Sequence, residues 1–308
     1  MKPYLKIFTL LLFCALFTAG LYGLNSSNDT SGHDTETIQS DDIKHLMLVA
    51  GAASHSTGEH EHRAGVLLFE RCLNDVYGLE VSTHFEGWPD DDSAFDDADA
   101  AVFYMDGGGN HPIVQDGRLD LIQGHIDRGM SIGAIHYAVE VPEENGGRQF
   151  KDWLGGYYET YYSANPMWDA EFNNLPNHPI MRGVEEFTVY DEWYFNIRFR
   201  PHMAGITPLL TAVPSDDTRD GPYVWPEGPY DHIMDAKGES EALSWVVDRK
   251  DGGRGFGFTG GHFHENWGND GFRTYVLNSL VWLAGLDVPA DGVQCVVTDA
   301  DLQKNLDE

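Results

Sequence analysis

The stretch Ser131-Ile132-Gly133-Ala134-Ile135-His136-Tyr137-Ala138 decides the fold. Small or apolar residues fill its first five positions, and a polar side chain follows them. This pattern predicts a short strand buried on both faces, because strands covered by helices on both sides have nearly continuous apolar sequences. A tight turn at His136 would present the imidazole at the carboxyl edge of a parallel sheet, where ligands bind in such folds.

Apolar runs that end in Gly or polar loops alternate with helical patterns around this strand. Further strands are predicted at residues 45–51, 79–85, 98–105 and 255–259, and helices at residues 64–73, 119–128 and 272–283, the last of them amphipathic. Strands that alternate with helices at this pitch predict an α/β fold with a doubly wound, mostly parallel sheet and flanking helices.

The two ends of the chain differ from this pattern. Residues 1–24 start with Lys2 and Lys6 and continue into an apolar run, which is typical of a signal peptide or of an N-terminal anchor. The composition of residues 25–43 predicts a disordered acidic linker. Residues 44–293 are expected to form one domain, and residues 294–308 a polar, mobile tail. We therefore expect an exported protein, periplasmic or extracellular, with no membrane contact beyond a membrane anchor at the N-terminus.

Charge and cysteine content exclude several functions. With 50 acidic and 19 basic residues the net charge is −31, which argues against nucleic-acid binding. Cys14, Cys72 and Cys295 make neither a disulfide framework nor a zinc-cluster spacing, and Cys72 is interpreted as a buried, inert thiol. The G-x-G-x-x-G match at residues 255–260 lies inside a strand and no helix follows it, so no nucleotide cofactor is expected.

Histidines gather just after the predicted strands or in the loops there. Because these positions face one rim of a parallel sheet, they predict a pocket for a divalent metal or for acid–base chemistry. The alternative is a set of polar loops whose histidines bond to the backbone. The members are His55, His60, His62, His136, His262 and His264, with carboxylates from Glu59, Glu61, Asp106, Glu140 or Glu192.

The metal candidates form two pairs with i, i+2 spacing, His60 with His62 and His262 with His264. Side chains two apart on a strand leave it on the same side, so both pairs are expected to face the rim. Zinc, manganese or nickel would suit such imidazoles.

Glycines and aromatic residues are the candidates for substrate binding. Three glycines after Asp106 could offer backbone N–H groups to a ligand oxygen, or they could form only a tight turn. Aromatic residues in loops, among them Trp225, suit sugar rings, although most are expected to serve packing. The candidates are Asp106, Gly107, Gly108, Gly109, Tyr157, Trp193, Tyr194 and Trp267.

Several short motifs in order resemble the ThuA-like (trehalose utilisation) family over residues 44–293. They are Gly58-Glu59-His60-Glu61-His62, Gly133-Ala134-Ile135-His136, Gly155-Gly156-Tyr157, His178-Pro179-Ile180, Asp191-Glu192-Trp193-Tyr194 and Gly261-His262. The resemblance implies a class I glutamine amidotransferase-like, flavodoxin-like fold. In that fold a cysteine occupies the turn where this chain has His136, so amidotransferase activity is not implied.

The function expected from these observations is acid–base chemistry on a carbohydrate or keto-sugar. His136 and Glu192, with Asp191, are the catalytic candidates, and a divalent metal would assist an isomerase, lyase or hydrolase reaction. The alternative is a carbohydrate-binding module without turnover.

Overall fold

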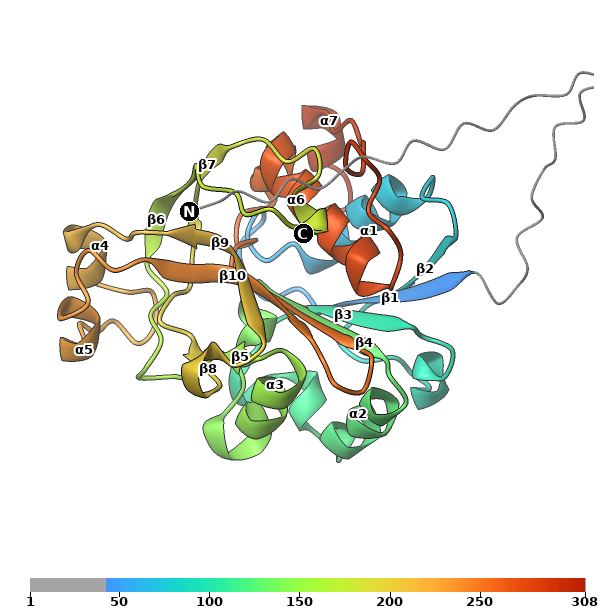
Figure 1. The fold of residues 1–308 in the computed structure, drawn as a ribbon, viewed down its shortest axis with the longest axis horizontal. Coiled ribbons are helices and arrows are strands. Elements are labelled where there is room, and N and C mark those ends of the chain that lie inside the picture. Colours follow the sequence, from blue (N-terminus) through green and yellow to red (C-terminus); the bar gives the residue numbers. More distant parts are fainter. Residues whose placement is uncertain (1–42, 308) are drawn as a thin grey trace, which may run out of the picture. The chain divides into compact units, whose positions relative to one another are not determined.

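A seven-stranded sheet with the order β2-β1-β3-β4-β11-β10-β9 forms the centre of the protein (Figure 1). The computed structural model describes residues 43–307, so the expected signal peptide or anchor and residues 25–42 of the expected linker lie outside the described residues. The strands of this sheet are β1 (Lys44–Ala50), β2 (Leu79–His84), β3 (Ala100–Tyr104), β4 (Ser131–Ile135), β9 (Ile206–Ala212), β10 (Glu241–Asp248) and β11 (Arg254–Phe258).

The sheet is mostly parallel. β1 pairs in parallel with β2 and β3, and β4 with β3 and β11, whereas β10 is antiparallel to both of its neighbours. The predicted α/β class with a mostly parallel sheet is therefore confirmed. Two small antiparallel pairs lie outside it, β5 (Gly156–Tyr157) with β8 (Arg198–Phe199) and β6 (Met167–Phe172) with β7 (Phe187–Glu192).

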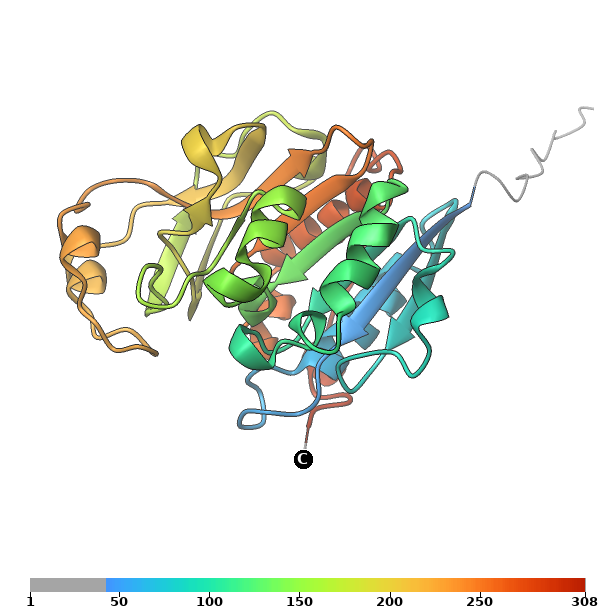
Figure 2. The ribbon, with the colours of Figure 1, turned by 90° about the horizontal axis from the view of Figure 1, so that it is seen from below.

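Helices cover both faces of the sheet, with α1 and α6 on one face and α2 and α3 on the other (Figures 1 and 2). Along β1, Leu46 and Leu48 enter the core that contains α1 and α6, while Met47 and Val49 enter the opposite core. This two-sided burial explains the continuous apolar sequence of the inner strands. The helices are α1 (His62–Leu73), α2 (Arg118–Asp127), α3 (Arg148–Trp153), α4 (Asp216–Asp220), α5 (Asp231–Met234), α6 (Asp270–Leu283) and α7 (Asp299–Leu302).

Helix α6 is buried on all sides rather than amphipathic. Every residue from Gly271 to Leu283 is buried. The sheet lies on one side of the helix, and chain segments that come before and after it supply the rest of the cover. Phe187 of β7 contacts Phe272, and the backbone N–H of Val293 donates a hydrogen bond to the Asn278 side-chain oxygen at 2.8 Å. None of the helices within residues 43–307 is both long and apolar enough to cross a bilayer.

A disulfide joins Cys72 at the end of α1 to Cys295, and the Cα atoms are 5.3 Å apart. The interpretation of Cys72 as an inert thiol is therefore wrong. The two cysteines are 223 residues apart, so no local pattern in the sequence pairs them. The expected mobile tail is also wrong: Leu302 is buried, and the backbone N–H of Asp307 donates to the Glu61 carboxylate at 2.7 Å.

Candidate functional site

The chain turns sharply at His136, directly after β4. His136 has a φ of 56°, in the left-handed region that non-glycine residues rarely adopt, and it starts a short 3₁₀ turn, His136–Val139. Its side chain is fully buried at the carboxyl edge of the sheet. The tight turn predicted from the sequence is present. The structure adds the backbone strain, which is often kept where a side chain must be aimed.

Four buried side chains meet beside this turn, and we call them the His/Glu group. They come from the loop before α1, the turn after β4, the end of β7 and the loop after β11. The His60 Nε2 lies 3.0 Å from the His136 Nε2 and 3.0 Å from the His262 Nδ1. The Glu192 Oε2 lies 2.9 Å from the His262 Nδ1 and 3.4 Å from the His136 Nε2.

The outward nitrogens of two of these rings are occupied by acceptors. His60 Nδ1 donates to the Asp106 carboxylate at 2.8 Å, and His136 Nδ1 donates to the Thr259 carbonyl at 2.9 Å. Burial raises the pKa of Asp106, but hydrogen bonds and the adjacent imidazoles hold it at about 2, so this carboxylate can only accept. In the neutral rings the facing Nε2 atoms of His60 and His136 therefore both carry lone pairs.

Two lone pairs 3.0 Å apart repel each other unless a cation lies between or beside them. Burial lowers the pKa of His60 to about 3 despite Asp106, so this ring stays neutral. Burial also lowers the pKa of His136, but the Glu192 carboxylate raises it by more, so the net shift is upward. Without a metal, a proton on His136 supplies the positive charge that the group requires.

A divalent ion can take the place of that proton. Ligand distances of 2.0–2.1 Å around a tetrahedral ion imply ligand–ligand separations of about 3.3 Å, close to the 2.9–3.4 Å found here. Burial raises the pKa of Glu192, but hydrogen bonds with His136 and His262 outweigh burial and bring it to about 2. Acceptors on the outward nitrogens are the supports that metal-bound histidines usually have. The His/Glu group could therefore hold a metal.

A cavity of about 380 Å³ opens onto this group. Its wall combines carboxylates, an amide and apolar side chains, as small-molecule sites commonly do. The lining residues are His55, Glu59, His60, Tyr137, Glu140, Asn165, Met167, Glu192, Tyr194, Val224, Trp225 and His262.

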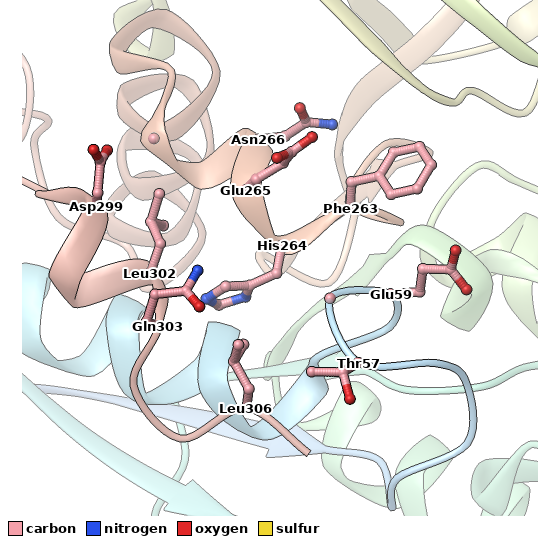
Figure 3. Close-up of a pocket in the computed structure, with 12 residues that line it drawn as sticks. Thr57, Glu59, Phe263, His264, Glu265, Asn266, Asp299, Leu302, Gln303 and Leu306 are labelled. Carbon is pink, nitrogen blue, oxygen red and sulfur yellow. The ribbon is translucent and has the colours of Figure 1, made fainter. Parts of the chain in front are cut away.

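His62 and His264 do not belong to the His/Glu group. The expectation that His262 and His264 leave one side of a strand is wrong, because β11 ends at Phe258 and His264 starts a 3₁₀ turn. His264 lines a different pocket of about 730 Å³, where its ring points toward Gln303 (Figure 3). His62 starts α1, and its Nε2 lies 3.7 Å from Asp106.

Asp191 holds the backbone around the group rather than facing the cavity. Its carboxylate accepts from the backbone N–H groups of Gly261 and His262 at 2.8 and 3.0 Å. It also accepts from the N–H of Glu192 at 2.8 Å. Asp191 thereby positions two members of the His/Glu group.

Only some of the candidate substrate-binding residues lie at the cavity. Tyr194 lines the cavity, with its hydroxyl 3.2 Å from His136 Nε2, whereas Tyr157, Trp193 and Trp267 are fully buried in the core. The glycine run packs beneath the 3₁₀ turn: Gly108 N–H donates to the Glu140 carbonyl, and a Cβ on Gly107 would meet the Tyr137 carbonyl oxygen at 2.0 Å. Asp106 supports His60.

Two further residues lie at the cavity wall: Asn165, which the sequence did not indicate, and Glu140, which it gave only as one of several carboxylates. The Asn165 side chain donates to the Glu192 Oε1 at 2.9 Å. Glu140 accepts from Thr160 at 2.8 Å, and burial together with the Glu192 charge raises its pKa to about 7 despite this hydrogen bond. A loop asparagine carries no recognisable sequence signal, and Glu140 was one of several carboxylates near the turn.

The raised pKa of Glu140 predicts a pH-dependent effect of Glu140→Gln on stability. In metal-free protein the folded state keeps this proton up to about pH 7, while the unfolded chain loses it near pH 4.5. Stability is therefore lost as pH rises through this window, by up to about 3 kcal/mol. Glu140→Gln should raise Tm by several degrees at pH 8 and by little at pH 4, measured by calorimetry with a chelator present. The exposed Glu143→Gln is the control, and equal Tm changes at both pH values would contradict the prediction.

Comparison with known proteins agrees with this architecture. The ThuA family model, described as trehalose utilisation, matches residues 47–283. A putative ThuA-like protein from Bacteroides uniformis is similar in structure at 15% identity and a TM-score of 0.55, covering 83% of this chain and 97% of its own. Another from Parabacteroides merdae has 17% identity and a TM-score of 0.54, covering 83% and 94%. Among curated proteins none matches. The resemblance found in the sequence is confirmed, and the chain belongs to the ThuA (trehalose utilisation) family.

Proposed function

We propose that this protein is an exported, metal-dependent enzyme that acts on a carbohydrate or keto-sugar. One observation carries the metal part of the proposal. The buried nitrogens of His60, His136 and His262 and the Glu192 carboxylate converge, and the first two rings have their outward N–H groups already used. Such a centre needs a positive charge, which a divalent ion supplies in place of the proton on His136, and the cavity beside it gives a small molecule access.

The carbohydrate part rests on the cavity wall and on the family. Carboxylates and an amide can bind hydroxyl groups, and exposed aromatic and apolar side chains suit the C–H faces of a sugar ring. The description of the matching family, trehalose utilisation, points to the same substrate class.

A bound divalent ion would polarise a carbonyl or stabilise an enediolate, which suits isomerisation, elimination or hydrolysis. His136 and Glu192, expected from the sequence to be the acid–base pair, would then be ligands. Glu59 and Glu140 are the carboxyl groups of the cavity wall outside the His/Glu group, and the pKa of about 7 for Glu140 suits a group that must exchange a proton near neutral pH.

Export is supported by the disulfide between Cys72 and Cys295, because disulfides form and persist mainly in oxidising compartments. The basic, apolar start of the chain supports it as well.

Metal analysis followed by a turnover assay tests the proposal. The purified protein should hold about one zinc, manganese or nickel ion by mass spectrometry, and chelation followed by re-addition of each ion should remove and restore turnover. The substrates are trehalose and trehalose with one secondary hydroxyl oxidised to a ketone. Stoichiometric metal and sugar binding without turnover would instead identify a carbohydrate-binding protein. A protein that takes up none of these ions would refute metal dependence.

A further inference from the structure

Trp225 is an exposed indole at the wall of the cavity. It is 69% exposed, whereas the other tryptophans within residues 43–307 are buried or half-buried. Its neighbour Val224 is 45% exposed and also lines the cavity. Two adjacent exposed apolar side chains on the wall of a cavity offer a ligand an apolar contact surface beside the polar groups.

The backbone of Trp225 is fixed although its ring is exposed. Its N–H donates to the Asn165 side-chain oxygen at 3.1 Å, and its carbonyl accepts from the Tyr158 hydroxyl at 3.3 Å. The preceding Val224 N–H donates to the Asn165 backbone carbonyl at 3.3 Å. The loop is therefore held in place at this residue, and the indole is presented at a defined position on the wall.

The same asparagine connects the indole to the His/Glu group. Asn165 accepts from Trp225 with its side-chain oxygen and donates with its side-chain nitrogen to Glu192 Oε1 at 2.9 Å. The other carboxylate oxygen, Glu192 Oε2, faces His136 and His262. The Asn165 amide therefore fixes the position of the indole relative to Glu192. A ligand that contacts both residues meets a preorganised surface.

We propose that Trp225 is the stacking platform of a sugar subsite that takes one pyranose ring. The ring would lie with its C–H face on the indole, and its hydroxyl rim would reach the carboxylates of Glu59 and Glu140 on the same wall. A cavity of about 380 Å³ is at the small end of ligand sites, which fits one ring rather than a long polymer. This inference rests on the proposed function. It assigns the contact with the sugar ring to the exposed Trp225, because the candidate tryptophans Trp193 and Trp267 are fully buried.

The test measures sugar binding to Trp225→Ala and Trp225→Phe in the metal-loaded protein. The probes are methyl α-D-glucopyranoside, trehalose and the trehalose ketone, with dissociation constants from calorimetry. Loss of the indole face should weaken binding by about tenfold or more, and phenylalanine should recover most of it. Tyr77→Ala removes an equally exposed aromatic ring that does not line the cavity and should leave binding unchanged. Metal content and Tm should stay at their wild-type values in all three variants.

A spectroscopic readout separates stacking from an indirect effect. Because Trp225 is the one strongly exposed tryptophan of residues 43–307, sugar should change the indole fluorescence of the wild type and not that of Trp225→Phe. If the wild type binds sugar and Trp225→Ala binds it equally well, the platform is refuted while the proposed function stands. Loss of metal or of several degrees in Tm in Trp225→Ala would refute it as well, because the ring would then be structural. If the wild type binds none of the three probes, the proposed substrate class fails and the subsite fails with it.

Discussion

Replacing His60 with alanine should lower the affinity for a divalent ion by more than about 100-fold. Changes in residues that only support a ligand commonly cost 10–100-fold, and His60 is itself placed at the centre of the group, 3.0 Å from both His136 and His262. The remaining atoms of the His/Glu group could not complete the same coordination. Affinity is measured by competition with a chromophoric chelator, and bound metal by mass spectrometry.

His264→Ala is the matched control for this experiment. Both imidazoles are buried and both were metal candidates in the sequence, but His264 lies in another pocket. It should keep its metal even if removing the ring lowers stability. Equal loss of metal from the two variants, with both still folded by circular dichroism, would show that the His/Glu group is not the binding site.

Removal of the disulfide should lower the free energy of unfolding by about 5 kcal/mol. The bond closes a loop across a sequence separation of 223 residues, and the loop-entropy gain rises with the logarithm of that length. The measurement is urea unfolding of the oxidised protein, the dithiothreitol-reduced protein and a Cys72→Ala, Cys295→Ala double variant.

The reducing agent supplies the internal control. Dithiothreitol should lower the unfolding midpoint of the wild type and leave the double variant unaffected. If the oxidised and reduced wild type and the double variant, with and without dithiothreitol, all unfold at the same urea concentration, the cross-link contributes nothing to stability and its entropic account is wrong for this fold.

The central fold could be predicted because its signals are local. The apolar run of β4 and the turn at His136 lie within eight consecutive residues, and β1 and α1 are each one continuous stretch of 7 and 12 residues. Because the inner strands are buried on both faces, their sequences are continuously apolar, and a continuous apolar run is easier to recognise than an alternation of apolar and polar residues. Helix α6 was predicted at the right place, but its amphipathic character was wrong, because the segments that cover its outer side come from residues before and after it in the chain.

The candidate site could be predicted only in part. His60, His136, Glu192 and His262 were all among the residues singled out, because polar residues after parallel strands meet at one edge. His62 and His264 lie outside the His/Glu group, because i, i+2 spacing places two side chains together only while a strand continues. Asn165 and Trp225 come from loops that meet through tertiary hydrogen bonds, which the sequence does not record.

At His136 the strained backbone determines where the side chain is placed, whereas the residue type determines its chemistry. The left-handed conformation is imposed by the sheet and the following turn, and residues that are not branched at Cβ can adopt it. Evolution or a protein engineer can therefore exchange the reactive group at this point by one substitution and keep the scaffold. The same sheet can therefore serve as the scaffold for different reactions. Which reaction it supports depends on the residue at this single turn and on the side chains around it.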